Sequence, residues 1–407
     1  MKRLGWWWLV ALLVVLGLAL RHNLLFLMSL LMALAGGASW LWTRFCLAGV
    51  TYRRRFGARR LFYGDETGLS LEVVNAKPLP LAWLRVEDEF PAELELLNAP
   101  LSASHLPGRR LLVNLLSLRW YERVTRHYRL RAGQRGAMVL GPAVVTSGDI
   151  FGQDVRHQTL LETDTLLVYP KMVPLTALGL PARHPFGDLR TPRRVVEDPL
   201  RLMGAREYRP GDSYRHIHWK ASAHRQALQT KVFDPSATRP LAIFLNVNTF
   251  EFIYEGLDRE LQEFAITAAA SIARFACEEG HPTGLYVNSV TWPGGQRIRI
   301  RPNAHPDQLA RILEALARVV MYGRWPIDAV VALESPTLRY GTTVVVVTPR
   351  INDRLRRALA DLPRHGLAAT LVALGDARLD APLPGVSYHH IGGREVWHGL
   401  QSLALAP

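Results

Sequence analysis

The chain has 407 residues, of which 49% are hydrophobic, so it is long enough to bury more than one core. Its formal net charge is +14: bases exceed acids by 4 in residues 1–50 and by 10 in residues 51–239, and are equal in number to the acids in residues 240–407. This distribution argues against a C-terminal nucleic-acid-binding domain, and two cysteines do not make a disulfide framework.

Two uncharged apolar runs in residues 1–50, at about 4–20 and 24–43, predict a membrane helical hairpin. A signal peptide is the alternative for the first run, but no small-residue cleavage site follows it and the second run begins almost at once. Lys2 and Arg3 precede the first run, and a basic cluster follows the second. Under the positive-inside rule we expect a two-span anchor in the inner membrane, with the bilayer as a partner and with both termini and the soluble domains in the cytoplasm.

Residues 51–175 predict an antiparallel β-sandwich. Short apolar runs with alternating patterns are separated by turn residues, and we expect strands at "LSLEVVN", "LAWLRVEDEF", "RLLVNLLSLRW", "RVTRHYRLRA" and "MVLGPAVVTS". In the first of these, Leu69, Leu71 and Val73 face the core while Ser70 and Glu72 face solvent. Residues 176–200 are rich in proline and lack periodicity, which predicts a connector.

Residues 236–407 alternate strand and helix patterns, which predicts an α/β domain with a mostly parallel sheet. We expect buried strands at "PLAIFLNVN", "TGLYVNS", "TTVVVVTP" and "AATLVAL", and a short excursion strand at "QRIRIRP". Helices are expected at about 257–279, 306–320 and 352–364. In such a sheet, ligand sites are expected at the carboxyl ends of the strands.

The order of these elements resembles a von Willebrand factor type A domain. That family binds a divalent cation through an Asp-x-Ser-x-Ser loop after the first strand, and the corresponding positions here are Asn246, Asn248 and Phe250. An amide lowers the charge offered to a hard cation, and phenylalanine has no oxygen ligand. We therefore expect a degenerate metal site, no bound metal and a metal-free recognition surface.

Residues 201–235, here named the signature segment, contain the densest group of basic, aromatic and turn-forming residues. Arg209, Pro210, Gly211 and Asp212 predict a turn with a positive φ at the glycine. Asp212 or the following serine is expected to cap a short helix. A strand stays open as an alternative, because apolar residues from Ile217 onward also alternate.

Three chemical interpretations of the signature segment compete with a structural one. His216 and His218 could bind a metal, although no third ligand is suitably spaced. Asp212, His218 and Lys220 could form an acid/base group, but no activated nucleophile accompanies them. A nucleic-acid grip would use the basic residues with the aromatic ones, namely Arg206, Arg209, Arg215, Lys220 and Arg225 with Tyr208 and Trp219.

Internal ion pairs to Glu207 and Asp212 favour the structural interpretation, a buried clasp at the junction between two domains. Under this interpretation Trp219→Ala destabilises the fold, because the packing of a large side chain is lost.

The string "AREYRPGDSYRHIHWKASAHR", with "LFYGDETGLSLEVVN" and "SGDIFG" upstream, resembles the bacterial and archaeal family called domain of unknown function 58. The family commonly has proline at the position of Ile150. Members are often encoded beside MoxR-type AAA+ ATPases and transglutaminase-like membrane proteins, which implies a membrane-anchored adaptor for an ATPase chaperone system. The motif positions carried onto this chain, as structural or partner-binding residues, are Arg206, Tyr208, Pro210, Gly211, Asp212, Arg215, Ile217, His218, Trp219, Lys220 and Ala223.

The resulting hypothesis is a non-enzymatic, membrane-anchored interaction protein whose cytoplasmic A-like domain docks a partner, with an AAA+ ATPase and other membrane proteins as the expected partners. It has no catalytic residues, no cofactor and no metal, and neither nucleic acid nor a small-molecule substrate is expected. The alternative is an enzyme or nucleic-acid-binding protein that uses the basic and aromatic residues of the signature segment.

Overall fold

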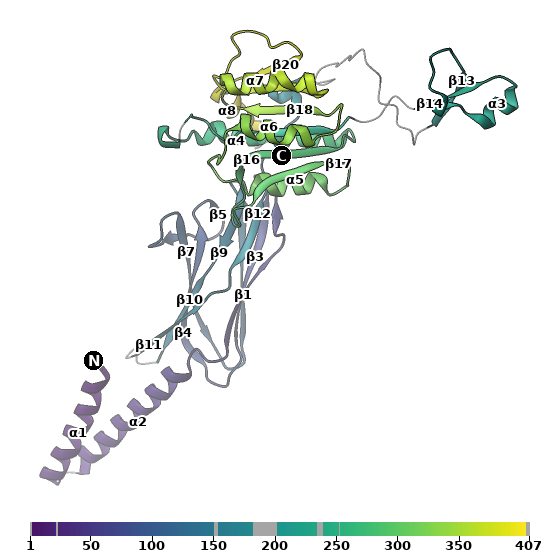
Figure 1. The fold of residues 1–407 in the computed structure, drawn as a ribbon. Coiled ribbons are helices and arrows are strands. Elements are labelled where there is room, and N and C mark those ends of the chain that lie inside the picture. The colour runs from purple at the N-terminus through teal and green to yellow at the C-terminus, as the bar shows by residue number, and fades with distance from the viewer. Residues whose placement is uncertain are drawn as a thin grey trace. The chain divides into compact units, whose positions relative to one another are not determined.

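The computed structural model describes residues 2–21, 23–149, 154–181, 202–233, 239–251 and 253–403. The chain divides into two compact units, Met1–Tyr169 and Pro170–Pro407 (Figure 1). The position expected to differ from the family, Ile150, and most of the expected connector lie outside the described residues. The connector begins with a 3-10 turn, η1 (Leu175–Leu178), that ends at Gly179.

The first unit begins with two apolar helices, α1 (Lys2–Leu20) and α2 (Asn23–Phe45). Among the described residues, α2 is the helix long and apolar enough to cross a membrane, and the uncharged part of α1, Gly5–Leu20, is shorter. The indole of Trp6 donates to the carbonyl oxygen of Met32 at 3.2 Å. A Cβ at Gly36 would lie 2.6 Å from Trp6 Nε1, so the glycine allows the two helices to approach closely.

The remainder of the first unit is rich in β-structure. One antiparallel sheet has the order β1-β3-β8-β5, and a second has the order β11-β10-β4-β7-β6. A small third sheet has the order β2-β12-β9, in which β2 and β12 are parallel. The strand bounds are β1 (Val50–Phe56), β2 (Arg60–Leu61), β3 (Glu66–Asn75), β4 (Leu81–Pro91), β5 (Leu94–Leu96), β6 (Ser102–Ala103), β7 (Arg109–Leu118), β8 (Arg123–Ala132), β9 (Gly136–Leu140), β10 (Ala143–Gly148), β11 (Val155–Leu160) and β12 (Asp164–Val168).

The two larger sheets contribute to one cluster of buried apolar side chains. Leu69, Leu71 and Val73 of β3 are in this cluster, which confirms the predicted core face of that strand. Glu72, expected in solvent, is buried because two arginines of the neighbouring strands cover it. Arg55 and Arg123 lie 2.9 and 3.0 Å from its carboxylate oxygens.

The expected single strand "MVLGPAVVTS" is wrong, because the structure divides it between β9 and β10. Gly141 has φ +91°, and Pro142 has no N–H to donate to a neighbouring strand. The chain therefore leaves one sheet and enters another at this dipeptide. A Cβ at Gly141 would also lie 2.7 Å from Arg54 Nη2, so a side chain has no room there.

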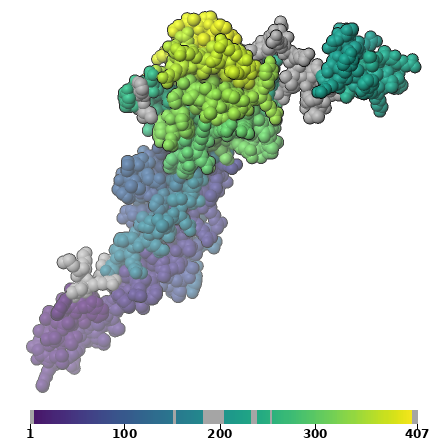
Figure 2. Space-filling view, in the orientation of Figure 1, coloured from purple at the N-terminus to yellow at the C-terminus, as the bar shows by residue number. Residues whose placement is uncertain are grey.

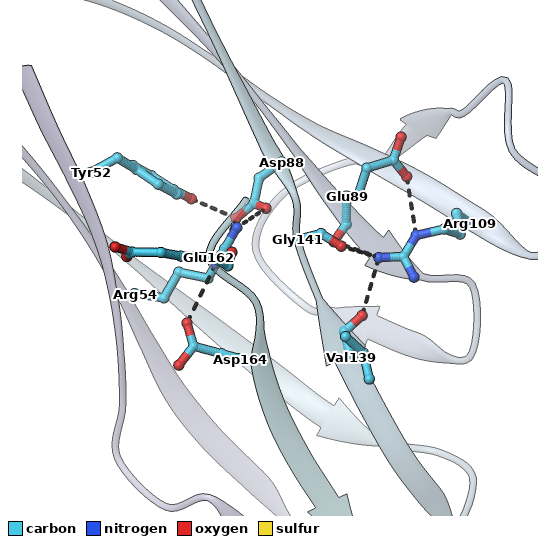
Figure 3. A network of polar contacts seen from close by, with 9 residues as sticks. All are labelled: Tyr52, Arg54, Asp88, Glu89, Arg109, Val139, Gly141, Glu162 and Asp164. Atoms are coloured by element: carbon cyan, nitrogen blue, oxygen red, sulfur yellow. Dashed lines mark hydrogen bonds and ion pairs between the residues drawn. The ribbon is translucent and has the colours of Figure 1, made fainter. Parts of the chain in front are cut away.

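Arg54 and Asp88 form a buried ion pair inside the β-rich region (Figure 3). The Arg54 Nε and Nη2 atoms each lie 2.7 Å from a carboxylate oxygen of Asp88, and the Tyr52 hydroxyl donates to the same carboxylate at 2.5 Å. Glu162 accepts from Arg54 Nη1 through its backbone oxygen at 3.0 Å. These bonds join β1 to β4, strands of the two larger sheets.

The core of the second unit is a six-stranded sheet of order β17-β16-β15-β18-β19-β20, in which only β17 pairs antiparallel. This confirms a C-terminal α/β domain with a mostly parallel sheet. Its strands are β15 (Leu241–Leu245), β16 (Thr283–Val290), β17 (Arg297–Asn303), β18 (Thr343–Thr348), β19 (Ala368–Leu374) and β20 (Val386–Ile391).

Helices cover both faces of this sheet. Its helices are α4 (Arg259–Glu278), α5 (Gln308–Ala317), α6 (Ile327–Glu334), α7 (Asp353–Asp361) and α8 (Arg394–Leu403). Helices α6 and α7 share a buried cluster with Phe244, Tyr286 and Val346, and α4 contacts the same central strands. Strand β18 is buried throughout because it is central and covered on both faces. The sequence analysis did not predict α6, β20 or α8.

The caps of α4 and α7 explain where these helices begin. Asp258 accepts from the backbone N–H of Leu261 at 3.1 Å, and Asn352 accepts from that of Leu355 at 2.8 Å. Each bond satisfies one of the free N–H groups of a first helical turn.

Candidate interaction surface

The described part of the signature segment, residues 202–233, is a small α+β element that forms a single lobe in the space-filling view (Figure 2, dark teal). Strands β13 (Leu202–Glu207) and β14 (Gln229–Phe233) pair antiparallel. Between them lie a 3-10 turn, η2 (Tyr214–His216), and a short helix, α3 (Trp219–Arg225).

Asp212 holds the predicted turn in place. The turn is confirmed: the N–H of Asp212 donates to the carbonyl of Arg209 at 3.0 Å, and Gly211 has φ +109°. Arg206 contacts the two carboxylate oxygens of Asp212 at 2.7 and 2.8 Å, in the two-pronged geometry that guanidinium groups favour. The backbone N–H of Arg209 and the hydroxyl of Thr230 donate to Asp212 at 2.9 and 3.2 Å. The bonds from Arg206 and then Arg209 lower the pKa of Asp212 to about 2.

Neither Asp212 nor Ser213 caps α3, contrary to the expectation from sequence. The cap is His218, whose Nδ1 accepts from the N–H of Ala221 at 3.2 Å. Asp212 cannot cap this helix, because α3 begins only at Trp219 and the Asp212 carboxylate is bound to Arg206 of β13. The backbone N–H of His218 in turn donates to Gln229 at 2.8 Å and joins α3 to β14.

The alternative of a continuous strand from residue 217 onward is also wrong, since α3 begins two residues later. Ile217 is buried, with 4% of its surface exposed, and it forms a β-bridge to Thr230.

Trp219 is not buried within the signature segment, because 70% of its surface is exposed. Tyr214 and Leu228 are exposed as well, and the ring of Tyr214 stacks on that of Tyr208 with centroids 6.0 Å apart. The basic residues Arg215, Lys220 and Arg225 are exposed in the same stretch. We call Tyr214, Trp219 and Leu228 with Arg215, Lys220 and Arg225 the basic-aromatic surface. Trp219→Ala should therefore leave the folding of the signature segment largely unchanged, because little packing would be lost.

The acid/base and metal interpretations gain no support from these contacts. Asp212 is engaged by Arg206, and His218 Nδ1 by the N–H of Ala221. Across the described ranges, no three His, Cys, Asp or Glu side chains are grouped in a way that could hold a metal ion.

Of the three expected metal-loop positions, Asn246 and Asn248 belong to an amide network at the carboxyl ends of the strands. Asn246 Nδ2 donates to Thr348 at 3.0 Å, and Asn246 Oδ1 accepts from Asn288 Nδ2 at 2.8 Å. Asn248 Oδ1 accepts from the N–H of Gly323 at 2.7 Å. The oxygens that a cation would need are therefore used by protein donors.

Phe250 lies outside this network and is exposed. Asn288 and Gly323 were missed by the sequence analysis. The available signal for Asn288 was an asparagine near the end of the buried strand pattern "TGLYVNS".

Comparisons with known proteins agree with the family resemblance that the signature segment carries. Residues 204–391 match the family described as "Protein of unknown function DUF58". The chain is also 27% identical over 331 residues to the Bacillus subtilis protein named "Uncharacterized protein YeaD", a match that covers 80% of this chain and 76% of that protein.

Solved structures are similar to only part of the chain. One is the CARDB domain of a Pyrococcus furiosus protein, with 13% identity and a TM-score of 0.21, covering 29% of this chain and 91% of that domain. Another is a cohesin module from a Clostridium perfringens glycoside hydrolase, with 18% identity and a TM-score of 0.20, covering 30% of this chain and 95% of the module. These TM-scores are too low to carry an argument.

Proposed function

We propose that the chain is a non-enzymatic, membrane-anchored interaction protein that docks a protein partner through the basic-aromatic surface. The observation that carries the proposal is the exposure of Trp219 on an element whose backbone is held by other residues. Tryptophan, tyrosine and arginine are the residues that most often dominate binding energy at protein interfaces. A rigid element presents them without a large ordering cost.

The proposed partner is a MoxR-type AAA+ ATPase, as the family resemblance implies. The exposed cations fit a partner surface with excess carboxylates, because charge complementarity speeds association and selects the partner. Such an ATPase needs cytosolic ATP, and the proposed topology supplies access to it. In that topology α1 and α2 both cross the inner membrane, and the basic residues that flank them keep both termini and the soluble units in the cytoplasm.

We further propose that the second unit is a von Willebrand A-like domain with a degenerate metal site. Its support is the strand order, in which the first strand is central and the third is an antiparallel edge strand, together with the amide network at Asn246 and Asn288. We assign it a recognition role without a cation.

Capture of partners by the full-length protein in detergent tests the interaction proposal. Wild-type protein should capture the ATPase, whereas Trp219→Ala should reduce its affinity by about thirtyfold, as expected for an interface hot spot of about 2 kcal/mol. The melting temperature should stay unchanged. Trp120→Ala is the matched control, because Trp120 is 66% exposed but lies in the β-rich region between β7 and β8.

Two results would count against the proposal: no ATPase among the captured proteins, or equal capture by the Trp219 and Trp120 variants. Nucleic-acid binding is the second candidate, favoured by the same exposed cations and rings. It predicts oligonucleotide binding that weakens steeply with salt, and a flat titration would remove it.

A further inference from the structure

A cavity of about 550 Å³ lies in the second unit at the amino ends of the parallel strands. Pro240, Pro282 and Thr342 line it, and each stands immediately before a strand, β15, β16 and β18 respectively. This is the edge opposite to the amide network. The volume is within the range of pockets that hold small molecules, roughly 300–1,000 Å³.

Two arginines, Arg301 and Arg339, line this cavity. Within the described part of the chain, neither guanidinium has a hydrogen-bond or ion-pair partner, and no carboxylate is among the lining residues. Both side chains would therefore keep their full charge toward a ligand.

The contrast with the preceding arginines of β17 is direct. Arg297 and Arg299 lie 3.1 and 2.7 Å from the carboxylate of Glu334, which is buried. Residues 297, 299 and 301 share one side of the strand, because side chains alternate along it. Glu334 thus pairs with the first two guanidinium groups, whereas the third, Arg301, has no such partner among the described residues and lines the cavity.

Tyr286 adds a buried polar group to the same wall. Only 1% of its surface is exposed, and its hydroxyl has no hydrogen-bond partner among the residues that the structure describes. Burial raises the pKa of Tyr286, and Glu334 adds to this effect while Arg299 and Arg301 oppose it. The phenol therefore stays protonated at neutral pH, and its buried hydroxyl is closed off from the cavity, so Tyr286 contributes the shape of this wall.

We propose that this cavity binds a small organic anion through a phosphate or carboxylate group. Arg301 and Arg339 hold the oxyanion, since guanidinium groups match the geometry of both groups. The apolar body of the ligand packs against Pro282, Pro302 and Leu338. The sequence analysis expected no small-molecule substrate, and this site adds a ligand that is independent of the proposed partner docking.

Calorimetric titration of the full-length protein in detergent tests the site with four probes: phenyl phosphate, benzoate, inorganic phosphate and benzyl alcohol. The two aromatic anions share one ring and differ in the oxyanion, inorganic phosphate lacks the apolar body, and benzyl alcohol lacks the charge. We expect at least one aromatic anion to bind, and the stronger of the two identifies the oxyanion. Inorganic phosphate should bind more weakly than phenyl phosphate, and benzyl alcohol should not bind.

Variants locate the binding. Arg301→Gln and Arg339→Gln should each weaken the binding of the preferred anion by about tenfold or more, since each removes charge-assisted hydrogen bonds. Arg357→Gln, at an exposed arginine of α7, is the matched control and should bind as the wild type does.

The proposal is overturned if neither aromatic anion binds at millimolar concentration, if benzyl alcohol binds as well as they do, or if the Arg301 and Arg339 variants bind like the Arg357 variant. Unchanged melting of each variant separates lost binding from lost folding. Failure here leaves the docking proposal untouched, because that proposal is read out by capture of the ATPase.

Discussion

Removing Asp88 from the buried network of the β-rich region should destabilise that region severely. In Asp88→Ala, the Arg54 guanidinium loses two bonds of 2.7 Å, and the Tyr52 hydroxyl loses its acceptor. The remaining partners of Arg54 are a backbone oxygen at 3.0 Å and an Asp164 oxygen at 3.4 Å. A buried cation would then lack its main counter-charge, which costs about 3–5 kcal/mol.

The protonation states do not relieve this cost. Burial lowers the pKa of Arg54, but the bonds to Asp88 outweigh it and the net effect is a raised pKa. Burial and the neighbouring Asp88 also raise the pKa of Tyr52 well above its usual value. In the wild type, both groups therefore stay protonated at neutral pH and donate to Asp88.

Hydrogen exchange measured by mass spectrometry on the full-length protein is the suitable assay, because it reports opening of the first unit separately from the second. Protection of β1 and β4 should fall by roughly 10² to 10⁴-fold in Asp88→Ala, since each 1.4 kcal/mol corresponds to a factor of ten. Glu87→Ala is the control on the same strand. It removes an exposed pair with Arg85 and should cost at most about 1 kcal/mol.

A second variant separates the charge from the packing. The double substitution Arg54→Met with Asp88→Leu removes both partners and should cost less than Asp88→Ala alone, because no buried charge is stranded. The reasoning is refuted if Asp88→Ala loses no more protection than Glu87→Ala.

Two further predictions concern the second unit. First, the pKa of Asp212, about 2, lies below the usual value of about 3.9 for an unfolded chain, so its stabilising bonds are fully present above that value and are lost as pH falls through 2. The amide shift of Arg209, followed by NMR on ¹⁵N-arginine-labelled protein, should show a midpoint near pH 2 that moves upward in Arg206→Gln; a wild-type midpoint near 4 would contradict the role of Arg206. Second, Gly323→Ala should destabilise the second unit by about 1–3 kcal/mol, because the new Cβ would lie 2.6 Å from Asn248 Oδ1 and also meet the Asn288 amide. Gly399→Ala, where a Cβ meets nothing within 4 Å, should be neutral or stabilising in the same denaturant titration, and equal effects of the two substitutions would show that the amide network yields freely.

Much of the fold could be predicted, because the spacing of apolar residues along the chain reflects which side chains each strand or helix buries. The apolar runs at 241–245, 283–290, 343–348 and 368–374 are strands of the parallel sheet. The elements that were missed have weaker patterns: β20 (Val386–Ile391) contains two histidines and is only partly buried at most positions, and α6 has only 8 residues and begins directly after Pro326. The Gly141-Pro142 break was readable in hindsight from turn chemistry, because proline cannot donate inside a sheet.

The candidate site shows the limit of reading residues without their contacts. The turn at Pro210 and Gly211 follows from backbone preferences, which are local. The burial of Trp219 does not depend on local sequence. A tryptophan at the first residue of a helix can point to a core or to solvent. The same holds for His218, whose role as a cap depended on where the helix began.

The sequence by itself determined the apolar N-terminal helix, the β-rich region, the α/β region and the similarity to the DUF58 family, because each depends on composition, periodicity or motif order along the chain. Only the tertiary structure decided which polar groups meet. It bound Asp212 to Arg206, closed the amide network around Asn246 and buried Asp88 against Arg54. Among the described residues, it left Trp219 exposed and gave the guanidinium groups of Arg301 and Arg339 no hydrogen-bond or ion-pair partner. The physical reason is that a hydrogen bond or an ion pair depends on distances of a few ångströms between atoms whose positions the whole fold sets, which no local pattern encodes.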